Sequence, residues 1–210
     1  MHISQILSKI KQIHPDKLPG FMAQSKMSPP NRKKFNKEEL KKFEAKESAV
    51  LILLYEKNGE SYIVFTQRHE YKGAHSGQIS LPGGKRDPED EDLQSTALRE
   101  AKEEVGAILN KKDILLELTW LYVPPSNFVI YPFLAYTEKE ANFIKEEREV
   151  KEILEFKVED LLNKDNQKVF LYHNEKLNIQ FESPSFQIEG KTIWGATAMI
   201  ISELLSILEA

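Results

Sequence analysis

The chain has 210 residues and a formal net charge of −4. This length suits one full domain with a small accessory segment, and the negative charge argues against a general nucleic-acid binder. Cysteine is missing, which excludes disulfides, thiolate metal sites and a cysteine nucleophile. No signal-peptide pattern and no apolar run long enough to span a bilayer occur, so we expect a soluble, cytoplasmic protein without membrane contact.

The first 47 residues differ from the rest of the chain. Apolar side chains recur there at helical spacing: Ile3, Ile6, Leu7, Ile10 and Ile13. This spacing predicts a helix lying on the domain, and the charged residues over 32–46 predict a solvated helix rather than a nucleic-acid patch. We therefore expect an N-terminal helical extension over 1–47 and a main domain over 48–210. The extension could cap the domain, extend a dimer interface or cover the substrate.

Short apolar runs separated by turns predict the strands of the main domain. Residues 48–55 form a continuous run typical of a strand buried on both faces, and an Asn58-Gly59 turn returns the chain along 61–67. Apolar residues at helical spacing predict a closing helix over 194–208. Further strands are expected over 79–81, 114–123, 128–137, 150–158, 169–172, 177–181 and 186–193.

The stretch over 81–106 contains the chemically most informative pattern. A glycine turn and an acidic loop precede a predicted helix with Glu100, Glu103 and Glu104 on one face, because residues three and four apart are neighbours on a helix. The three charges repel one another, and a divalent cation turns this repulsion into attraction. Carboxylate oxygens favour Mg²⁺ or Mn²⁺, and a metal-held water deprotonated by a glutamate would be a nucleophile for phosphorus.

The residues around these glutamates bear on the choice between a site and a plain surface. Gly83 and Gly84 let the backbone approach cations and phosphates closely, and Arg99 can orient or neutralise a carboxylate through its planar fork. A charged run by itself is more often a solvated helix face. The Gly-Gly turn before the run and Gly106 after it favour the site.

The same stretch resembles the Nudix hydrolase box, which is a Gly, five residues, a Glu, seven residues and then Arg-Glu-aliphatic-x-Glu-Glu-x-Gly-aliphatic. Glu91 and the residues from Arg99 to Ala107 match, with Ala at the aliphatic positions. Six residues, not five, separate Gly84 from Glu91. This extra residue resembles the variant of the coenzyme A diphosphatase branch of the family.

Two further segments resemble the same branch. Residues 65–68 (Phe-Thr-Gln-Arg) and 75–84 are similar to its coenzyme A signature, with Leu81 in place of the more usual Phe. Residues 194–198 (Trp-Gly-Ala-Thr-Ala) are similar to a segment near the end of that branch. The resemblance covers roughly residues 48–205, and its box is more specific than its substrate signature.

The resemblance implies an α/β (α+β) Nudix fold, with a mixed β-sheet sandwiched between helices. It implies metal-dependent hydrolysis of a nucleoside diphosphate linked to another moiety. The leading substrate is coenzyme A or a derivative, which gives adenosine 3′,5′-bisphosphate and 4′-phosphopantetheine. ADP-ribose, nucleotide sugars and dinucleoside polyphosphates are alternatives, and a non-catalytic nucleotide-binding regulator is a less favoured one. Whether two copies form a homodimer stays open.

Carried over by position, the resemblance implies that Glu100, Glu103 and Glu104 are metal ligands for Mg²⁺ or Mn²⁺, with Glu100 and Glu103 also catalytic. Arg99 and Glu91 take supporting roles in catalysis. The general base varies in this family, and it is either a box glutamate or one from a later loop.

Outside the helix, the candidates come from three places. Glu149 is our candidate for a later general base, with Glu146 and Glu147 as competitors. Arg68 and His75 are expected to meet the substrate's phosphates, although a structural hydrogen bond explains His75 equally well. The expected substrate-binding residues are Arg68, His75, Gly83 and Gly84.

Overall fold

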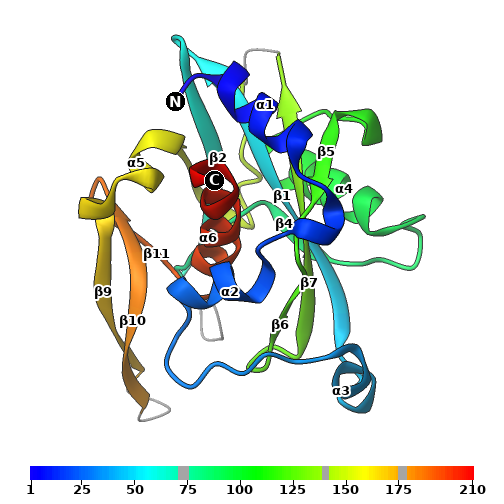
Figure 1. Ribbon diagram of the computed structural model, residues 1–210. Coiled ribbons are helices and arrows are strands. Elements are labelled where there is room, and N and C mark those ends of the chain that lie inside the picture. Colours follow the sequence, from blue (N-terminus) through cyan, green and yellow to red (C-terminus); the bar gives the residue numbers. More distant parts are fainter. Residues whose placement is uncertain (71–75, 139–141, 175–178) are drawn as a thin grey trace.

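The structure, a computed structural model, describes residues 1–70, 76–138, 142–174 and 179–210 (Figure 1). Its body is an eight-stranded sheet in which β1 runs antiparallel to β2 and parallel to β7. The strands of this sheet are β1 (Lys46–Lys57), β2 (Glu60–Arg68), β3 (Ile79–Ser80), β4 (Gly83–Lys85), β5 (Ile114–Glu117), β6 (Leu121–Val123), β7 (Phe128–Thr137) and β8 (Val150–Lys157).

Helices cover both faces of this sheet. The described α-helices are α1 (Ile3–Gln12), α2 (Gly20–Gln24), α3 (Lys37–Lys42), α4 (Leu93–Val105), α5 (Val158–Leu162) and α6 (Gly195–Glu209). Because successive strand residues point to opposite faces, Ile52 and Leu54 of β1 pack in one cluster with α1 and α6, while Leu51 and Leu53 pack with α4. The predicted mixed sheet between helices is confirmed, and α1 and α6 cross its near face in Figure 1.

A second, three-stranded sheet extends from the body at the left of Figure 1. Its strands are β9 (Gln167–Asn174), β10 (Ile179–Ile188) and β11 (Lys191–Trp194), in the order β11-β10-β9. The single strand predicted over 186–193 is wrong. Glu189 and Gly190 both have positive φ, 51° and 75°, which is the backbone of a tight hairpin turn, so the chain reverses there.

The single strand predicted over 114–123 is also wrong, because the chain leaves the sheet between β5 and β6. Leu118 still donates to Pro132 O, but the backbone N–H and hydroxyl of Thr119 donate to the carboxylate of Glu203 in α6. Glu203 is 0% exposed, and burial raises its pKa above the ordinary value. A buried carboxylate requires such donors. Because Thr119 supplies them, its backbone N–H does not pair with β7.

The same carboxylate holds part of the N-terminal segment. The backbone N–H of Gly20 and the side-chain amide of Gln24 both donate to Glu203, and the buried isoleucines of α1 lie in the core cluster of α6. The predicted first helix is therefore present and packs on the body. The predicted charged helix is shorter than expected, since only Lys37–Lys42 is helical there. Among the described residues, no helix is long and apolar enough to cross a membrane.

Replacing Glu203 by glutamine should destabilise the chain, because an amide can accept from only some of these donors and turns its own N–H groups towards the rest. We expect the free energy of unfolding to fall by about 1–3 kcal/mol, measured by urea denaturation. Glu209→Gln, on the same helix and paired with Lys164 at the surface, is the matched control and should cost below about 1 kcal/mol. Equal losses for the two variants would contradict this account.

Candidate active site

The orientation of α4 is fixed by its caps and its apolar stripe. The side chain of Asp92 accepts from the backbone N–H of Ser95 at 2.8 Å, which begins the helix as an N-cap does. Gly106 ends the helix in the left-handed conformation, with φ 71°. Ala97 and Ala101 are fully buried against the sheet. The carboxylates therefore lie at the border of the buried face.

Glu104 is the most enclosed of the three carboxylates. Its residue is 4% exposed, and the backbone N–H of Gly83 donates to its Oε2 at 3.1 Å. Burial raises the pKa of Glu104 to about 7, against the opposing effects of the Gly83 hydrogen bond and the Arg68 charge. The surrounding protein does not fully stabilise the ionised form of a carboxylate in this position, and a cation would relieve this.

The two glycines are in close contact with different neighbours, Gly84 with the carboxylate of Glu100 and Gly83 with the backbone of β1. A Cβ on Gly84 would lie 2.4 Å from Oε1 of Glu100, and a Cβ on Gly83 would lie 2.4 Å from the backbone O of Ala49. These distances are shorter than any real contact of a Cβ atom. Both glycines lie in β4, which pairs with β1. The backbone of β4, which has no side chain at these two positions, therefore lies against the carboxylate face of α4.

Glu100 and Glu103 share one partner, the guanidinium of Arg99. Its Nη1 lies 2.8 Å from Oε1 of Glu100 and 3.1 Å from Oε2 of Glu103. The side chain of Glu100 is 12% exposed and that of Glu103 is 57% exposed. Burial raises the pKa of Glu100, and the nearby charges of Glu103 and Glu149 add to this while Arg99 opposes it.

The opposite edge of Arg99 is held by Asp90, a residue that the sequence comparison with the box did not single out. Nε and Nη2 of Arg99 donate to the two carboxylate oxygens of Asp90, both at 3.0 Å. These bonds hold the pKa of Asp90 well below its usual range. Glu91, the expected supporting residue, instead pairs with Lys111 at 2.6 Å and its side chain is 81% exposed.

A signal for Asp90 was present in the sequence. Asp90 follows Gly84 after five residues, which is the box spacing, and the extra residue then falls between Asp90 and Arg99. Glu91 has the residue type that the box requires, whereas Asp90 has the required spacing from Gly84. Further bonds to Asp90 come from the hydroxyl of Thr96 at 2.8 Å and the backbone N–H of Asp87 at 2.9 Å. Asp90 is thus a fixed anchor for Arg99.

Glu149 lies near this cluster because of a backbone contact between two distant segments. The backbone N–H groups of Ile144 and Glu146 donate to the carbonyls of Val105 and Glu104, at 3.0 and 3.1 Å. The acidic segment is therefore docked on the last turn of α4. The charge of Glu149 contributes to raising the pKa of both Glu100 and Glu104. Nothing in the sequence signalled this docking.

Arg68 lies at the end of β2, close enough to Glu104 for its charge to lower the pKa of that group. Its Nε is buried and finds no hydrogen-bond partner among the described residues. An unsatisfied guanidinium nitrogen beside a carboxylate cluster suits an incoming anion. His75, the other expected phosphate ligand, lies outside the described residues.

Divalent cations suit the donor set, which consists of carboxylate oxygens beside backbone with no room for a side chain. Within the described parts of the chain, no three His, Asp or Glu side chains already converge on a single point, since Glu103 is turned to Arg99.

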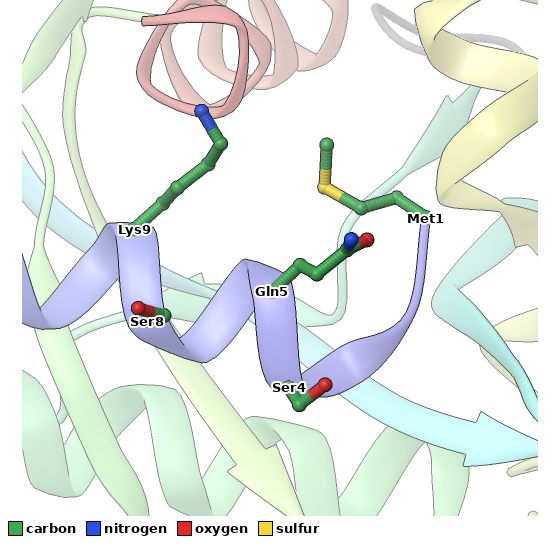
Figure 2. Close-up of a pocket in the computed structure, with 5 residues that line it drawn as sticks. All are labelled: Met1, Ser4, Gln5, Ser8 and Lys9. Carbon is green, nitrogen blue, oxygen red and sulfur yellow. The ribbon is translucent and has the colours of Figure 1, made fainter.

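Two hollows on the surface of the described residues lie away from these carboxylates. One lies along α1 and is lined by Met1, Ser4, Gln5, Ser8 and Lys9, as Figure 2 shows.

Comparisons with known proteins agree with this geometry. The model of the NUDIX domain matches residues 45–173. The uncharacterized Nudix hydrolases NudL of Yersinia pestis (strain Pestoides F) and of Yersinia pseudotuberculosis serotype O:1b (strain IP 31758) are each 32% identical over 145 residues, covering 69% of this chain and 71% of theirs. A MutT/nudix family protein from Enterococcus faecalis shares the fold, with a TM-score of 0.56, 16% identity, and 97% of this chain and 73% of that one covered. The chain belongs to the Nudix family.

Removing the charge of Asp90 should destabilise the chain more than removing the charge of its exposed neighbour, Glu91. We expect Asp90→Asn to lower the free energy of unfolding by about 1–3 kcal/mol, because a half-buried guanidinium loses its bidentate bond to a buried carboxylate. The adjacent Glu91→Gln should cost below about 1 kcal/mol, as its ion pair is exposed. Thermal and urea unfolding of both variants measure this, and the reverse order would contradict the assignment.

Proposed function

We propose that this Nudix protein is a metal-dependent diphosphatase whose substrate is coenzyme A or a derivative. Family membership supports hydrolysis of a nucleoside diphosphate linked to another moiety. The observation that carries the proposal is the carboxylate face of α4, closed on one side by bare glycine backbone and flanked by Arg68. Coenzyme A itself is supported by the sequence signature over 65–68 and 75–84.

In this proposal Glu100, Glu103 and Glu104 hold Mg²⁺ or Mn²⁺. A bound cation of this kind supplies positive charge to the diphosphate and acidifies a coordinated water. The chain's own residues prepare the site. Burial keeps the charge of Glu104 uncompensated, and Arg99 holds Glu100 and Glu103 at hydrogen-bond distance on one edge of its guanidinium. Asp90 fixes Arg99 and so positions both glutamates.

The substrate's phosphates would meet Arg68, His75 and the backbone of Gly83 and Gly84. The support for Arg68 is its buried Nε near Glu104, which has no hydrogen-bond partner within the described part of the chain, because guanidinium groups bind phosphate oxygens in pairs. The support for Gly84 is the absence of space for a Cβ beside the carboxylate of Glu100, and the support for Gly83 is its backbone N–H, which donates to Glu104. His75 rests on the sequence signature alone.

Glu149 would take the proton from the attacking water. Its support is electrostatic, since its charge acts on both Glu100 and Glu104 and therefore lies close to the proposed metal ligands. Glu146 is drawn into the backbone contact with α4, and the side chain of Glu147 is 76% exposed and paired with Lys145. Glu149 is exposed as well, so the action of its charge on Glu100 and Glu104 is what favours it over its two neighbours.

We also propose that residues 1–47 act as an extension of a Nudix hydrolase domain formed by 48–210. The support is that α1 and α2 attach to α6 through buried isoleucines and the Glu203 network. In this arrangement the extension caps the face of the sheet opposite α4.

Substitution of the buried ligand should abolish turnover while the fold is retained. We expect Glu104→Gln, and likewise Glu103→Gln, to lower kcat by about 10²–10³-fold, in line with loss of a charged group that stabilises a transition state. Steady-state hydrolysis of coenzyme A with Mg²⁺ measures kcat, and circular dichroism checks the fold. Unchanged turnover in a folded variant would refute the ligand assignment.

The base assignment separates three neighbouring glutamates. Glu149→Gln should lower kcat by about 10²–10⁴-fold, the usual contribution of a general base, and should remove the acidic limb of the pH–kcat profile. Glu147→Gln and Glu146→Gln serve as matched controls and should retain kcat within a few-fold. A loss confined to either control would move the base to that residue.

A panel of diphosphates tests the substrate. Chromatography of the products should show adenosine 3′,5′-bisphosphate and 4′-phosphopantetheine from coenzyme A with Mg²⁺ or Mn²⁺. ADP-ribose, a nucleotide sugar and a dinucleoside polyphosphate should be cleaved with much lower kcat/KM. Rapid cleavage of one of these with coenzyme A left intact would replace the proposed substrate within the same chemistry.

A further inference from the structure

Strand β9 is the outer strand of the small sheet, yet its sequence is typical of an inner one. Among the described residues, β9 pairs with β10 alone, and Figure 1 shows it at the outer margin of the sheet. Its centre is Val-Phe-Leu-Tyr over 169–172, which is apolar on both faces. Natural edge strands are instead kept short or carry charges and proline, because a bare apolar edge pairs with other chains.

Within the small sheet, β10 is the central strand. The ladder partners of Phe170 and Leu171 are Ser183 and Glu182, whereas Val169 and Tyr172 pair with Pro184 and Phe181. The rings of Phe170 and Tyr172 pack against Trp194 on one face of the sheet. On the other face Val169 and Leu171 are 63% and 53% exposed. β9 thus carries two exposed apolar side chains beside an edge that no described strand covers, and a further strand paired with β9 would cover that edge.

We propose that this further strand is β9 of a second copy of the chain, so that two small sheets join edge to edge about a two-fold axis near Phe170 and Leu171. Antiparallel pairing of a strand with itself is closed and uses the same surface on both copies. Lys168 is the one Lys, Arg, Asp or Glu in β9, and antiparallel pairing places the two copies of it at opposite ends. No like charges therefore meet, and the apolar residues 169–172 pair among themselves.

Sedimentation velocity of the full chain over a concentration series tests this association. The wild type should sediment as a dimer that dissociates on dilution. The double substitution Val169→Lys and Leu171→Lys should sediment as a folded monomer, because it places like charges close together across the two-fold axis. Met22→Lys and Ile108→Lys are matched controls, since these apolar side chains are 82% and 77% exposed elsewhere, and both variants should remain dimeric.

The absence of cysteine from the chain allows a second test of the geometry. Residues facing each other near a two-fold axis in antiparallel strands bring their Cα atoms to a distance that a disulfide spans. Single cysteines placed in turn at 169, 170, 171 and 172 should therefore cross-link two copies under mild oxidation only at the one or two positions nearest the axis. A cysteine at position 22 should not.

Three results would overturn the proposal. These are a wild type that is monomeric at every concentration, a dimer that survives the double lysine substitution, and cross-linking that is no stronger at 169–172 than at 22. The first result would leave the β9 edge to an extended segment of a different protein. The test is independent of the proposed reaction, because no residue of β9 belongs to the carboxylate site.

Discussion

The packing of α4 against the sheet is the constraint on which the site depends. Ala97 and Ala101 have no exposed surface, so the helix can neither rotate nor move away without opening the core. Consequently the side chain of Glu104 is buried, and that of Glu100 is largely buried. Interior packing tolerates little displacement, and the helix therefore holds repelling carboxylates at fixed positions.

The surrounding groups reduce this repulsion without removing it. Arg99 supplies positive charge on one side of Glu100 and Glu103, and Asp90 fixes the direction in which Arg99 points. On the other side, Gly83 donates a single N–H to Glu104 and Arg68 acts only through its charge. Paired charges lower the cost of burial but rarely abolish it. The remaining negative potential is what would attract a cation.

Local sequence patterns anticipated the parts of the structure that local physics determines. The spacing of Glu100, Glu103 and Glu104 implied a shared helix face, and the apolar residues of β1 implied a strand buried on both sides. Contacts between distant segments could not be read in this way. Thr119 leaves its strand for Glu203 because a carboxylate 84 residues further along the chain needs donors, and the docking of Ile144 on Val105 joins segments that no motif connects.

The box comparison shows the same division within a single motif. Spacing placed Glu100, Glu103 and Glu104 together on α4, because helical geometry fixes which side chains are neighbours. In the loop before the helix, geometry tolerates an extra residue, and the structure gives the contact with Arg99 to Asp90 and exposes Glu91. A carboxylate of either length can bind a guanidinium, so the residue type alone could not decide between them.

We propose that the carboxylate face of α4 holds a divalent cation. Titration of the metal-free chain with Mn²⁺, followed by calorimetry or by the resonance signal of free Mn²⁺, tests it without any substrate. The account predicts saturable binding by the wild type, and binding weakened by at least about tenfold in Glu104→Gln. Binding of equal strength in a folded Glu104→Gln variant, or no binding by the wild type, would contradict it.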